Sequence, residues 1–438
     1  MAPHSETGPL GNVLIIAYHF PPQAGSSGSL RTMKYCRYLP EFGWQPAVLT
    51  PHSRAYEKID EKSVNLIPKG VPVIRSFAMD TKKHLSVGGR YLRYTALPDR
   101  WVGWVFGGVP AGLRAVRKHK IDVLCSTFPI VSAAVIGLWL QRFTGLPWVL
   151  DLRDPMSQDD YPDDPLVRRV WSKVERACIR RVSRVIFTAE ATRRMYLERY
   201  PEFLKPEMCV LISNGYDETD FRDLEVSAIG PVPTGRQIRL VHSGLIYPVE
   251  RDPRPMFRAV ARLKKMGRLT ADRVQIVFRA PGSEDLYRKL LAERDIEDLI
   301  TLEPRVPYRQ ALQECAQADG LLLFQAADCD MQIPAKAYEY LRVGKPILAM
   351  TTHTGDTAAL LREVGGSTIV NIASEDEIYD GLSSFVDALG AGTHPVPEKD
   401  KIRRYTREAQ AGQLARVFDE LKENTLHAET AQIETVAE

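Results

Sequence analysis

The sequence predicts an α/β protein with two successive, doubly wound parallel sheets. Three observations support this fold class: strand-like apolar runs alternate with amphipathic stretches of helical length, the alternation stops and restarts once, and a stretch rich in proline and glycine separates the two series. The length of 438 residues is sufficient for two domains of ordinary size. A hydrophobic content of 44% and a charged content of 26% are typical of a soluble globular protein.

The composition argues against several classes of protein. A net charge of +3 gives no reason to expect nucleic-acid binding. Six cysteines without CxxC spacing argue against a zinc site or a secreted disulfide framework, and they favour a reducing cytosol. Residues 1–10 are polar, and the most apolar stretch, residues 130–140, is far shorter than the roughly 20 residues of a membrane span. We therefore expect a cytoplasmic protein without a secretory signal.

The first series opens with a buried strand at residues 12–17, a loop, a helix at 30–42 and a second strand at 46–50. Gly25 and Gly28 in this loop would let the backbone approach a ligand at the N-terminus of the helix. The spacing is not GxGxxG and the second strand ends without an acidic residue, so a dinucleotide site is not predicted. Tight turns alone would also explain both glycines.

A charged cluster follows the strand predicted at residues 148–150. Asp151, Arg153 and Asp154 stand at its carboxyl end. Ligands bind at the carboxyl ends of strands in doubly wound folds. The cluster therefore predicts either a ligand-binding group or an Arg–Asp ion pair that holds the loop.

Residues 81–109 interrupt the alternation of strands and helices. Basic and aromatic residues are interleaved there: Lys82, Lys83, Arg90, Tyr91, Arg93, Tyr94, Arg100, Trp101, Trp104 and Phe106. Such a mixture suits contact with a membrane surface or with a lipid-linked acceptor. A helical hairpin packed on the domain, with solvated basic residues, would explain the same pattern.

The second series of strands and helices follows a linker rich in proline and glycine at residues 227–237. Its most informative stretch, residues 333–349, predicts a helix that starts near Pro334, ends at Gly344 and leads into a buried strand. Glu339 lies in this helix, and a carboxylate can accept two hydrogen bonds from a ribose diol. The helix N-terminus offers free N–H groups and a partial positive charge to a phosphate. An ordinary helix with a solvated Glu is the alternative.

The sequence IPAKAYEYL at residues 333–341 resembles the nucleotide-binding signature of retaining glycosyltransferases of the GT-B fold, the large family-four group. The usual signature is a Glu, seven residues and a second Glu. Glu339 matches the second Glu, which holds the nucleotide ribose in that family, and Met331 occupies the position of the first. The chain is closer to members with the shorter form Ile-Pro-x-Lys-x-Tyr-Glu-Tyr-Leu. The resemblance thus also implies that Ile333 and Lys336 bind the nucleotide sugar.

Further resemblance lies in the loop HSGLIYPVERDPRP, which follows the first strand of the second series. It is similar to the family's Gly-x-x-x-x-x-x-Arg loop, which implies that Gly244 makes the turn and that Arg251 contacts the diphosphate, with Arg254 as second choice. The family commonly adds a Lys a few positions on, and this loop has no clear match to it. In the family a later loop contacts the base through its backbone, which implies Val306 in EPRVPY.

On the first domain the resemblance implies that the loop with Gly25 and Gly28 touches the donor diphosphate, with Arg31 in support. Carboxylates or a His of this domain would orient the acceptor hydroxyl. Asp154 is the leading candidate, with His19 beside it. Retaining transfer does not require a protein nucleophile, and we assign none.

The resemblance covers about residues 12–390 and implies the GT-B architecture, two Rossmann-like doubly wound domains facing across a cleft. The predicted division is an N-terminal acceptor-side domain at 1–225, a nucleotide-sugar domain at 226–390, a C-terminal helix at 391–424 that crosses back to the first domain, and a disordered tail at 425–438.

These features predict a glycosyltransferase that moves a hexose or N-acetylhexosamine from a nucleotide-diphosphate sugar, with UDP or GDP as nucleotide, to a sugar or lipid-linked hydroxyl acceptor. By resemblance, transfer proceeds with retention and serves bacterial cell-envelope or exopolysaccharide synthesis. We expect a cytoplasmic location. If residues 81–109 contact a membrane, the protein would lie at the inner face of the plasma membrane. No cofactor is expected. Asp328 and Asp330 have the letters of an Asp-x-Asp metal motif but precede the signature helix, so no metal is expected either.

Two other functions stay open. One is a GT-B epimerase that acts on a UDP-N-acetyl sugar, which would need several acid–base carboxylates around the sugar. The other is a catalytically inactive GT-B module that binds a partner protein. Met331 in place of the first Glu favours the inactive module, whereas Glu339 and Arg251 argue for an intact nucleotide site.

Overall fold

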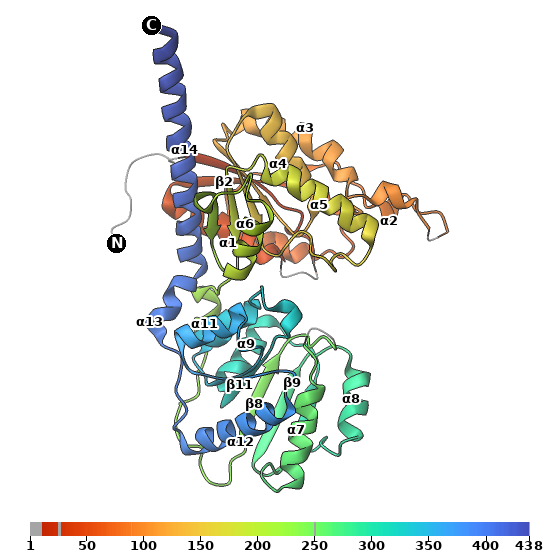
Figure 1. Cartoon of the computed structure of the whole chain (residues 1–438), viewed down its shortest axis with the longest axis vertical. Helices are drawn as coiled ribbons and strands as arrows, with labels where there is room; N and C mark the ends of the chain where they lie inside the picture. The colour runs from red at the N-terminus through yellow and green to blue at the C-terminus, as the bar shows by residue number, and fades with distance from the viewer. Residues whose placement is uncertain (1–10, 25–27, 89, 249–250, 438) are drawn as a thin grey trace. The chain divides into compact units, whose positions relative to one another are not determined.

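A computed structural model describes residues 11–24, 28–88, 90–248 and 251–437. The chain divides into two compact units (Figure 1). Unit 1 comprises Met1–Ser213 together with Arg407–Glu438, and unit 2 comprises Asn214–Thr406. None of the helices in the described part of the chain combines the length and the hydropathy that a membrane span requires.

Unit 1 contains a seven-stranded parallel sheet in the order β3-β2-β1-β4-β5-β6-β7. The strands are β1 Gly11–Ile16, β2 Trp44–Pro51, β3 Val73–Ser76, β4 Val123–Thr127, β5 Trp148–Leu152, β6 Arg184–Phe187 and β7 Cys209–Leu211. The α-helices are α1 Gly28–Tyr38, α2 Thr81–His84, α3 Gly103–Lys118, α4 Val131–Thr144, α5 Pro165–Ile179, α6 Glu190–Arg199 and α14 Arg407–Ala437.

Both faces of this sheet are buried, which is why its strands are apolar throughout. Successive residues of β1 point to opposite faces: Leu14 packs in one core with α3, α4 and α5, and Val13 packs in the other with α1 and α14. Helix α14 is fixed to unit 1 at Trp44, whose indole N–H donates to Asp419 at 2.8 Å and whose ring lies 5.1 Å from that of Phe418.

Unit 2 contains a six-stranded parallel sheet in the order β10-β9-β8-β11-β12-β13. The strands are β8 Ile238–Ser243, β9 Val274–Arg279, β10 Ile300–Glu303, β11 Gly320–Phe324, β12 Ile347–Met350 and β13 Ser367–Val370. The α-helices are α7 Arg254–Lys265, α8 Glu284–Ala292, α9 Tyr308–Gln317, α10 Ala335–Val343, α11 Asp356–Val364, α12 Glu375–Ala391 and α13 Lys399–Ile402. Two buried clusters, one on each face, complete the unit. The predicted fold class, two doubly wound α/β domains, is confirmed.

The limits of the units differ from the predicted ranges at two places. The boundary predicted between residues 225 and 226 lies inside unit 2, because Tyr216 and Phe221 are buried in the core of that unit and the Tyr216 N–H bonds to the Tyr405 carbonyl at 3.1 Å. At the other end, α14 is helical to Ala437, where disorder was predicted. The tail contains Ala, Glu and Gln, which favour helix.

Candidate functional site

Each sheet changes direction of winding once, between β1 and β4 in unit 1 and between β8 and β11 in unit 2. In open α/β sheets ligands bind outside the carboxyl ends of the strands at such a switch point. Most of the residues singled out in the sequence lie at these two places. Gly25 is outside the described residues.

Helix α10 forms as the sequence predicts. Pro334 precedes its first turn, and Ala337, Tyr338 and Leu341 are buried in the core. The helix ends where Gly344 adopts φ +80° and its N–H bonds to the Tyr340 carbonyl at 3.1 Å. The N-terminus of α10 follows the loop that leaves β11, at the switch point of unit 2.

Lys336, in the first turn of α10, contacts His242 near the end of β8. The buried His242 donates from Nδ1 to the Leu322 carbonyl at 2.8 Å, so its Nε2 accepts from the Lys336 ammonium at 3.1 Å. Burial, followed by the charge of Lys336, holds the pKa of His242 well below its ordinary value. The imidazole is therefore neutral and serves to position the ammonium.

The surroundings of Lys336 also shift the pKa of its ammonium group. Burial and, after it, the charge of Arg251 lower its pKa to about 7, although Glu339 acts in the opposite direction. Gly244, at φ +106°, lets the backbone approach, since a Cβ there would lie 3.1 Å from the Lys336 Nζ. The loop after β8 is joined to α10 as well, because the Ser243 N–H donates to the Tyr340 hydroxyl at 2.8 Å.

Arg251 lies at the same end of the sheet. Its guanidinium donates to the side-chain oxygen of Gln325 at 3.4 Å and to the Leu245 carbonyl at 3.3 Å, and it lies 5.2 Å from the centre of the Tyr247 ring. Gln325 is buried directly after β11 and donates to the Cys329 carbonyl at 3.2 Å. Arg254, the second choice for this role, is paired with Asp252 at 2.8 Å.

Glu339 lies half-buried in α10, and the Tyr308 hydroxyl at the start of α9 donates to it at 2.7 Å. Val306 stands two residues before Tyr308, in the loop after β10, so the structure connects this loop with Glu339. Val306 also lines a cavity of about 310 Å³. The side chain of Ile333 packs against the core and is partly exposed.

Unit 2 thus brings Gly244, Arg251, Lys336 and Glu339 to one edge of its sheet. Two cations beside a helix N-terminus form a surface suited to a diphosphate. The sequence did not lead us to predict the roles of His242, Gln325 and Tyr308. The position of His242 next to Ser243 and Gly244 at a strand end could have suggested the first.

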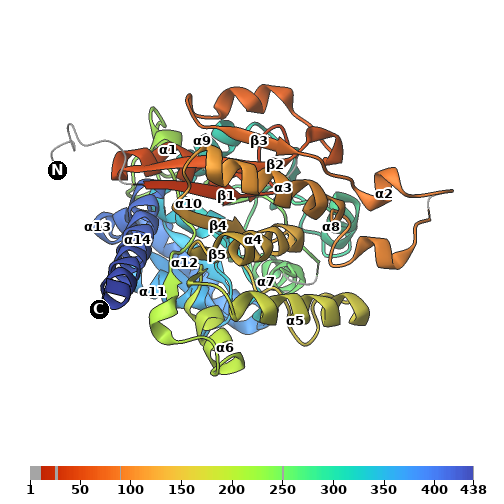
Figure 2. The ribbon, with the colours of Figure 1, turned by 90° about the horizontal axis from the view of Figure 1, so that it is seen from above.

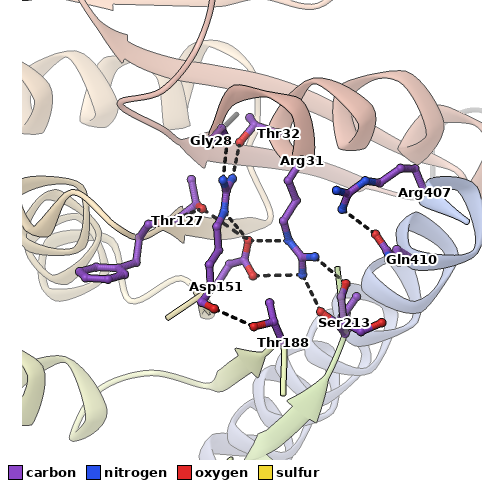
Figure 3. A network of polar contacts seen from close by, with 12 residues as sticks. Gly28, Arg31, Thr32, Thr127, Asp151, Thr188, Ser213, Arg407 and Gln410 are labelled. Atoms are coloured by element: carbon purple, nitrogen blue, oxygen red, sulfur yellow. Dashed lines mark hydrogen bonds and ion pairs between the residues drawn. The ribbon is translucent and has the colours of Figure 1, made fainter. Parts of the chain in front are cut away.

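Unit 1 uses its strand ends differently, as Figure 3 shows. Asp151, at 1% exposure, accepts from Arg31, at 2% exposure, through two hydrogen bonds of 3.1 and 3.2 Å. The same guanidinium donates to the carbonyls of Ser213 and Ile212, each at 2.8 Å. Of the two interpretations of the charged cluster, the Arg–Asp ion pair is therefore correct for Asp151. Arg31 holds this pair, and its support of the loop with Gly25 and Gly28 stays a prediction.

Arg153 continues this network. Its guanidinium donates to the Gly28 carbonyl at 2.5 Å and to the Thr32 hydroxyl at 3.4 Å, and its own carbonyl accepts from the Thr188 hydroxyl at 2.6 Å. The start of α1 is thereby tied to the ends of β5 and β6. Gly28 is the first residue of α1. Its carbonyl accepts the hydrogen bond from Arg153.

His19 and Asp154 follow β1 and β5 and are both half-buried. Burial, reinforced by the charge of Arg153, lowers the pKa of His19 to about 4. For Asp154, burial raises the pKa while the charge of Arg153 opposes the change. The imidazole of His19 is therefore neutral at neutral pH. Across the described residues, no group of three or more His, Cys, Asp or Glu side chains is arranged to hold a metal ion.

Comparisons with known proteins agree with this geometry. Residues 28–215 match the family model described as a glycosyl transferase 4-like domain. No curated protein sequence matches the chain. Among solved structures, sucrose-phosphate synthase from Thermosynechococcus elongatus aligns at 13% identity and TM-score 0.63, with 94% of this chain and 99% of that chain covered.

Two further structures are similar over the whole chain. HepE of Anabaena, in complex with UDP and glucose, aligns at 14% identity and TM-score 0.60, covering 94% of this chain and 100% of that one. The lipopolysaccharide outer core galactosyltransferase WaaB aligns at 12% identity and TM-score 0.58, covering 93% and 99%. These similarities establish that the chain has the GT-B fold.

Proposed function

We propose that the protein is a glycosyltransferase that moves a sugar from a nucleotide-diphosphate sugar to a hydroxyl acceptor, with retention of configuration. The observation that carries the proposal is the group formed by Arg251, Lys336 and Glu339 at the switch point of unit 2. The match of residues 28–215 to a glycosyl transferase 4-like domain supports the same class of reaction.

In this proposal the donor diphosphate binds beside Arg251, Lys336 and the N-terminus of α10. Negative charge grows on the diphosphate as the glycosidic bond breaks, and fixed cations stabilise that charge. His242 holds the Lys336 ammonium in place at 3.1 Å. Glu339 accepts hydrogen bonds from the ribose hydroxyls. The Tyr308 hydroxyl, which donates to the same carboxylate at 2.7 Å, fixes its orientation. The loop with Val306 contacts the base.

Unit 1 supplies the acceptor side in this proposal. His19 and Asp154 follow the carboxyl ends of β1 and β5 at the same edge of the sheet, and neither takes part in the Arg31–Asp151 pair. Asp154 orients the acceptor hydroxyl, with the neutral His19 beside it. No protein nucleophile, metal ion or other cofactor is assigned.

UDP is the first nucleotide to test, because the similar HepE structure was obtained with UDP and glucose. Similarity to WaaB supports an acceptor in a cell-envelope glycan, either a sugar or a lipid-linked sugar. A hexose or N-acetylhexosamine is the proposed transferred group, and the cytoplasm is the proposed location.

The test is a calorimetric and thermal-shift panel of UDP, GDP, ADP, CMP and NAD with the full-length protein. We expect micromolar binding of one nucleoside diphosphate, and measurably weaker binding of the same nucleotide by both Glu339→Ala and Lys336→Met. An exposed control on the same unit, Glu398→Ala, should bind like the wild type. Absence of binding by every nucleotide would contradict the proposal and favour an inactive, partner-binding module.

A further inference from the structure

The segment between β3 and α3 has an unusual surface, which we call the basic segment and define as residues 81–98. It contains four Lys or Arg residues, Lys82, Lys83, Arg90 and Arg93, and no Asp or Glu. In both Figure 1 and Figure 2, α2 and the chain that follows it project from the body of unit 1. Positive charge is therefore concentrated on a protruding part of the fold.

Large apolar side chains stand on the same projection and face solvent. Val87, Leu92 and Tyr94 are exposed to 86%, 75% and 76%. Val87 and Arg90 exchange two backbone hydrogen bonds of 2.8 and 3.1 Å, which fix the backbone of Val87 while its side chain faces solvent. Exposed apolar residues flanked by basic residues are typical of proteins that bind membrane surfaces.

The base of the segment is held firmly. Arg100 is paired with the buried Asp80 at 2.7 Å, and its carbonyl accepts from the Thr81 N–H at 2.7 Å. The Thr81 hydroxyl donates to the Thr95 carbonyl at 2.8 Å, which closes the segment into a loop. Arg93 forms an ion pair with Asp164 at the start of α5. The apolar residues are thus presented by an anchored loop rather than by a free end of the chain.

We propose that the basic segment docks unit 1 on a bilayer surface that contains anionic lipids, with Val87 and Leu92 entering the interface and Tyr94 at the headgroup level. The positive charge of the basic segment favours a bilayer over a second copy of the chain as the binding partner. A symmetric contact with a second copy of the chain would place this positive segment against itself, whereas anionic headgroups complement it. The contact would bring the proposed transferase to the surface where a lipid-linked acceptor lies.

The test is cosedimentation of the full-length protein with vesicles of phosphatidylcholine alone and of phosphatidylcholine mixed with phosphatidylglycerol, without nucleotide. We expect binding only to the anionic vesicles, weakened by salt. Leu92→Asp should lower the affinity roughly tenfold or more, since it removes an apolar group from the interface. The double variant Lys82→Gln, Arg90→Gln should lower it roughly fivefold for each charge removed.

Two matched controls lie on unit 1 outside the segment. Leu66→Asp changes a leucine that is 70% exposed, and Lys118→Gln removes an exposed charge at the end of α3. Both should bind vesicles like the wild type. Equal losses in these controls, or no binding of the wild type to anionic vesicles, would overturn the proposal. A dimer in solution that Leu92→Asp breaks, without vesicle binding, would assign the segment to self-association instead. Nucleotide binding by Leu92→Asp should match the wild type, so this test and that of the proposed function fail separately.

Discussion

The two sheets of the protein share one kind of switch point, yet they use the charged residues there in different ways. In unit 1, Arg31 and Asp151 neutralise each other, and the remaining N–H groups of Arg31 bond to backbone carbonyls. In unit 2, Arg251 and Lys336 donate to neutral groups, and the charge of Arg251 lowers the pKa of Lys336. Position at a switch point therefore does not by itself identify a ligand site.

The charge balance distinguishes the two edges. A buried ion pair whose hydrogen bonds are complete belongs to the fold, because its partners are satisfied within the protein. Two nearby cations, offset only in part by Glu339, leave the unit 2 edge with positive charge that an anion can satisfy. Substitutions at the first edge should thus affect stability, and those at the second should affect binding.

The largest effect is expected from Arg31→Ala. Asp151 would remain buried with only the more distant Arg153, 3.9 Å away, as its counter-charge, so the free energy of unfolding should fall by about 3 kcal/mol. Urea unfolding followed by tryptophan fluorescence measures the change. The double variant Arg31→Met, Asp151→Leu should recover only part of the loss, since it removes two charges but leaves Arg153 without the Asp151 carboxylate that lies 3.9 Å from it. A loss below about 1 kcal/mol, the size expected for an exposed pair, would show that this network does not act as a buried unit.

Arg251→Ala addresses the other edge and should lower turnover about 100-fold, the effect of removing one preorganised group that stabilises developing charge. Its melting temperature should stay close to that of the wild type, because Arg251 bonds to Gln325 and Leu245 through long contacts of 3.4 and 3.3 Å. Arg258→Ala, an exposed arginine on α7 paired with Glu375, is the matched control. Wild-type turnover in Arg251→Ala would move the diphosphate site elsewhere.

Glu339→Ala should weaken nucleotide binding by about 1–3 kcal/mol, because the ribose hydroxyls would lose their acceptor. Calorimetry with the nucleotide found in the panel measures this loss. Tyr308→Phe keeps the carboxylate and removes only the hydroxyl that contacts it at 2.7 Å, so its effect should be smaller. Unchanged affinity in Glu339→Ala, for every nucleotide, would remove the ribose assignment.

The sequence was sufficient to predict most of the fold, because both sheets are parallel and covered on both faces, which produces long apolar strands separated by amphipathic helices. It also predicted α10 and its end at Gly344, where local chemistry decides. Contacts between residues far apart in the chain were harder to predict from the sequence. Arg31 and Asp151 are 120 positions apart, and nothing local to either residue indicates that one neutralises the other.

The contact between Lys336 and the loop after β8 was also not predicted, because the two are far apart in the sequence. The loop after β8 lacks the second basic residue of the family pattern, and the structure brings a cation from α10 to that loop, 94 positions from His242. The domain boundary was missed for a related reason. Tyr216 and Phe221 commit their part of the chain to unit 2 through burial, whereas composition indicates only the later proline- and glycine-rich stretch.

The smallest effect, and the one most specific to the unit 2 edge, is a pH dependence of nucleotide binding. The pKa of Lys336 is about 7 in the absence of ligand, and a bound diphosphate would raise it. Well below pH 7 the ammonium is already charged, whereas above pH 7 the protein must take up a proton on binding, so affinity should fall by about fivefold between pH 7 and pH 8. The phosphates of the nucleotide ionise more fully as the pH rises, which opposes this trend. In Lys336→Met the phosphates still ionise but the ammonium is absent, so the affinity of this variant for the nucleotide should not fall between pH 7 and pH 8. Calorimetry of both proteins measures the difference, and equal pH profiles would show that Lys336 does not contact the nucleotide.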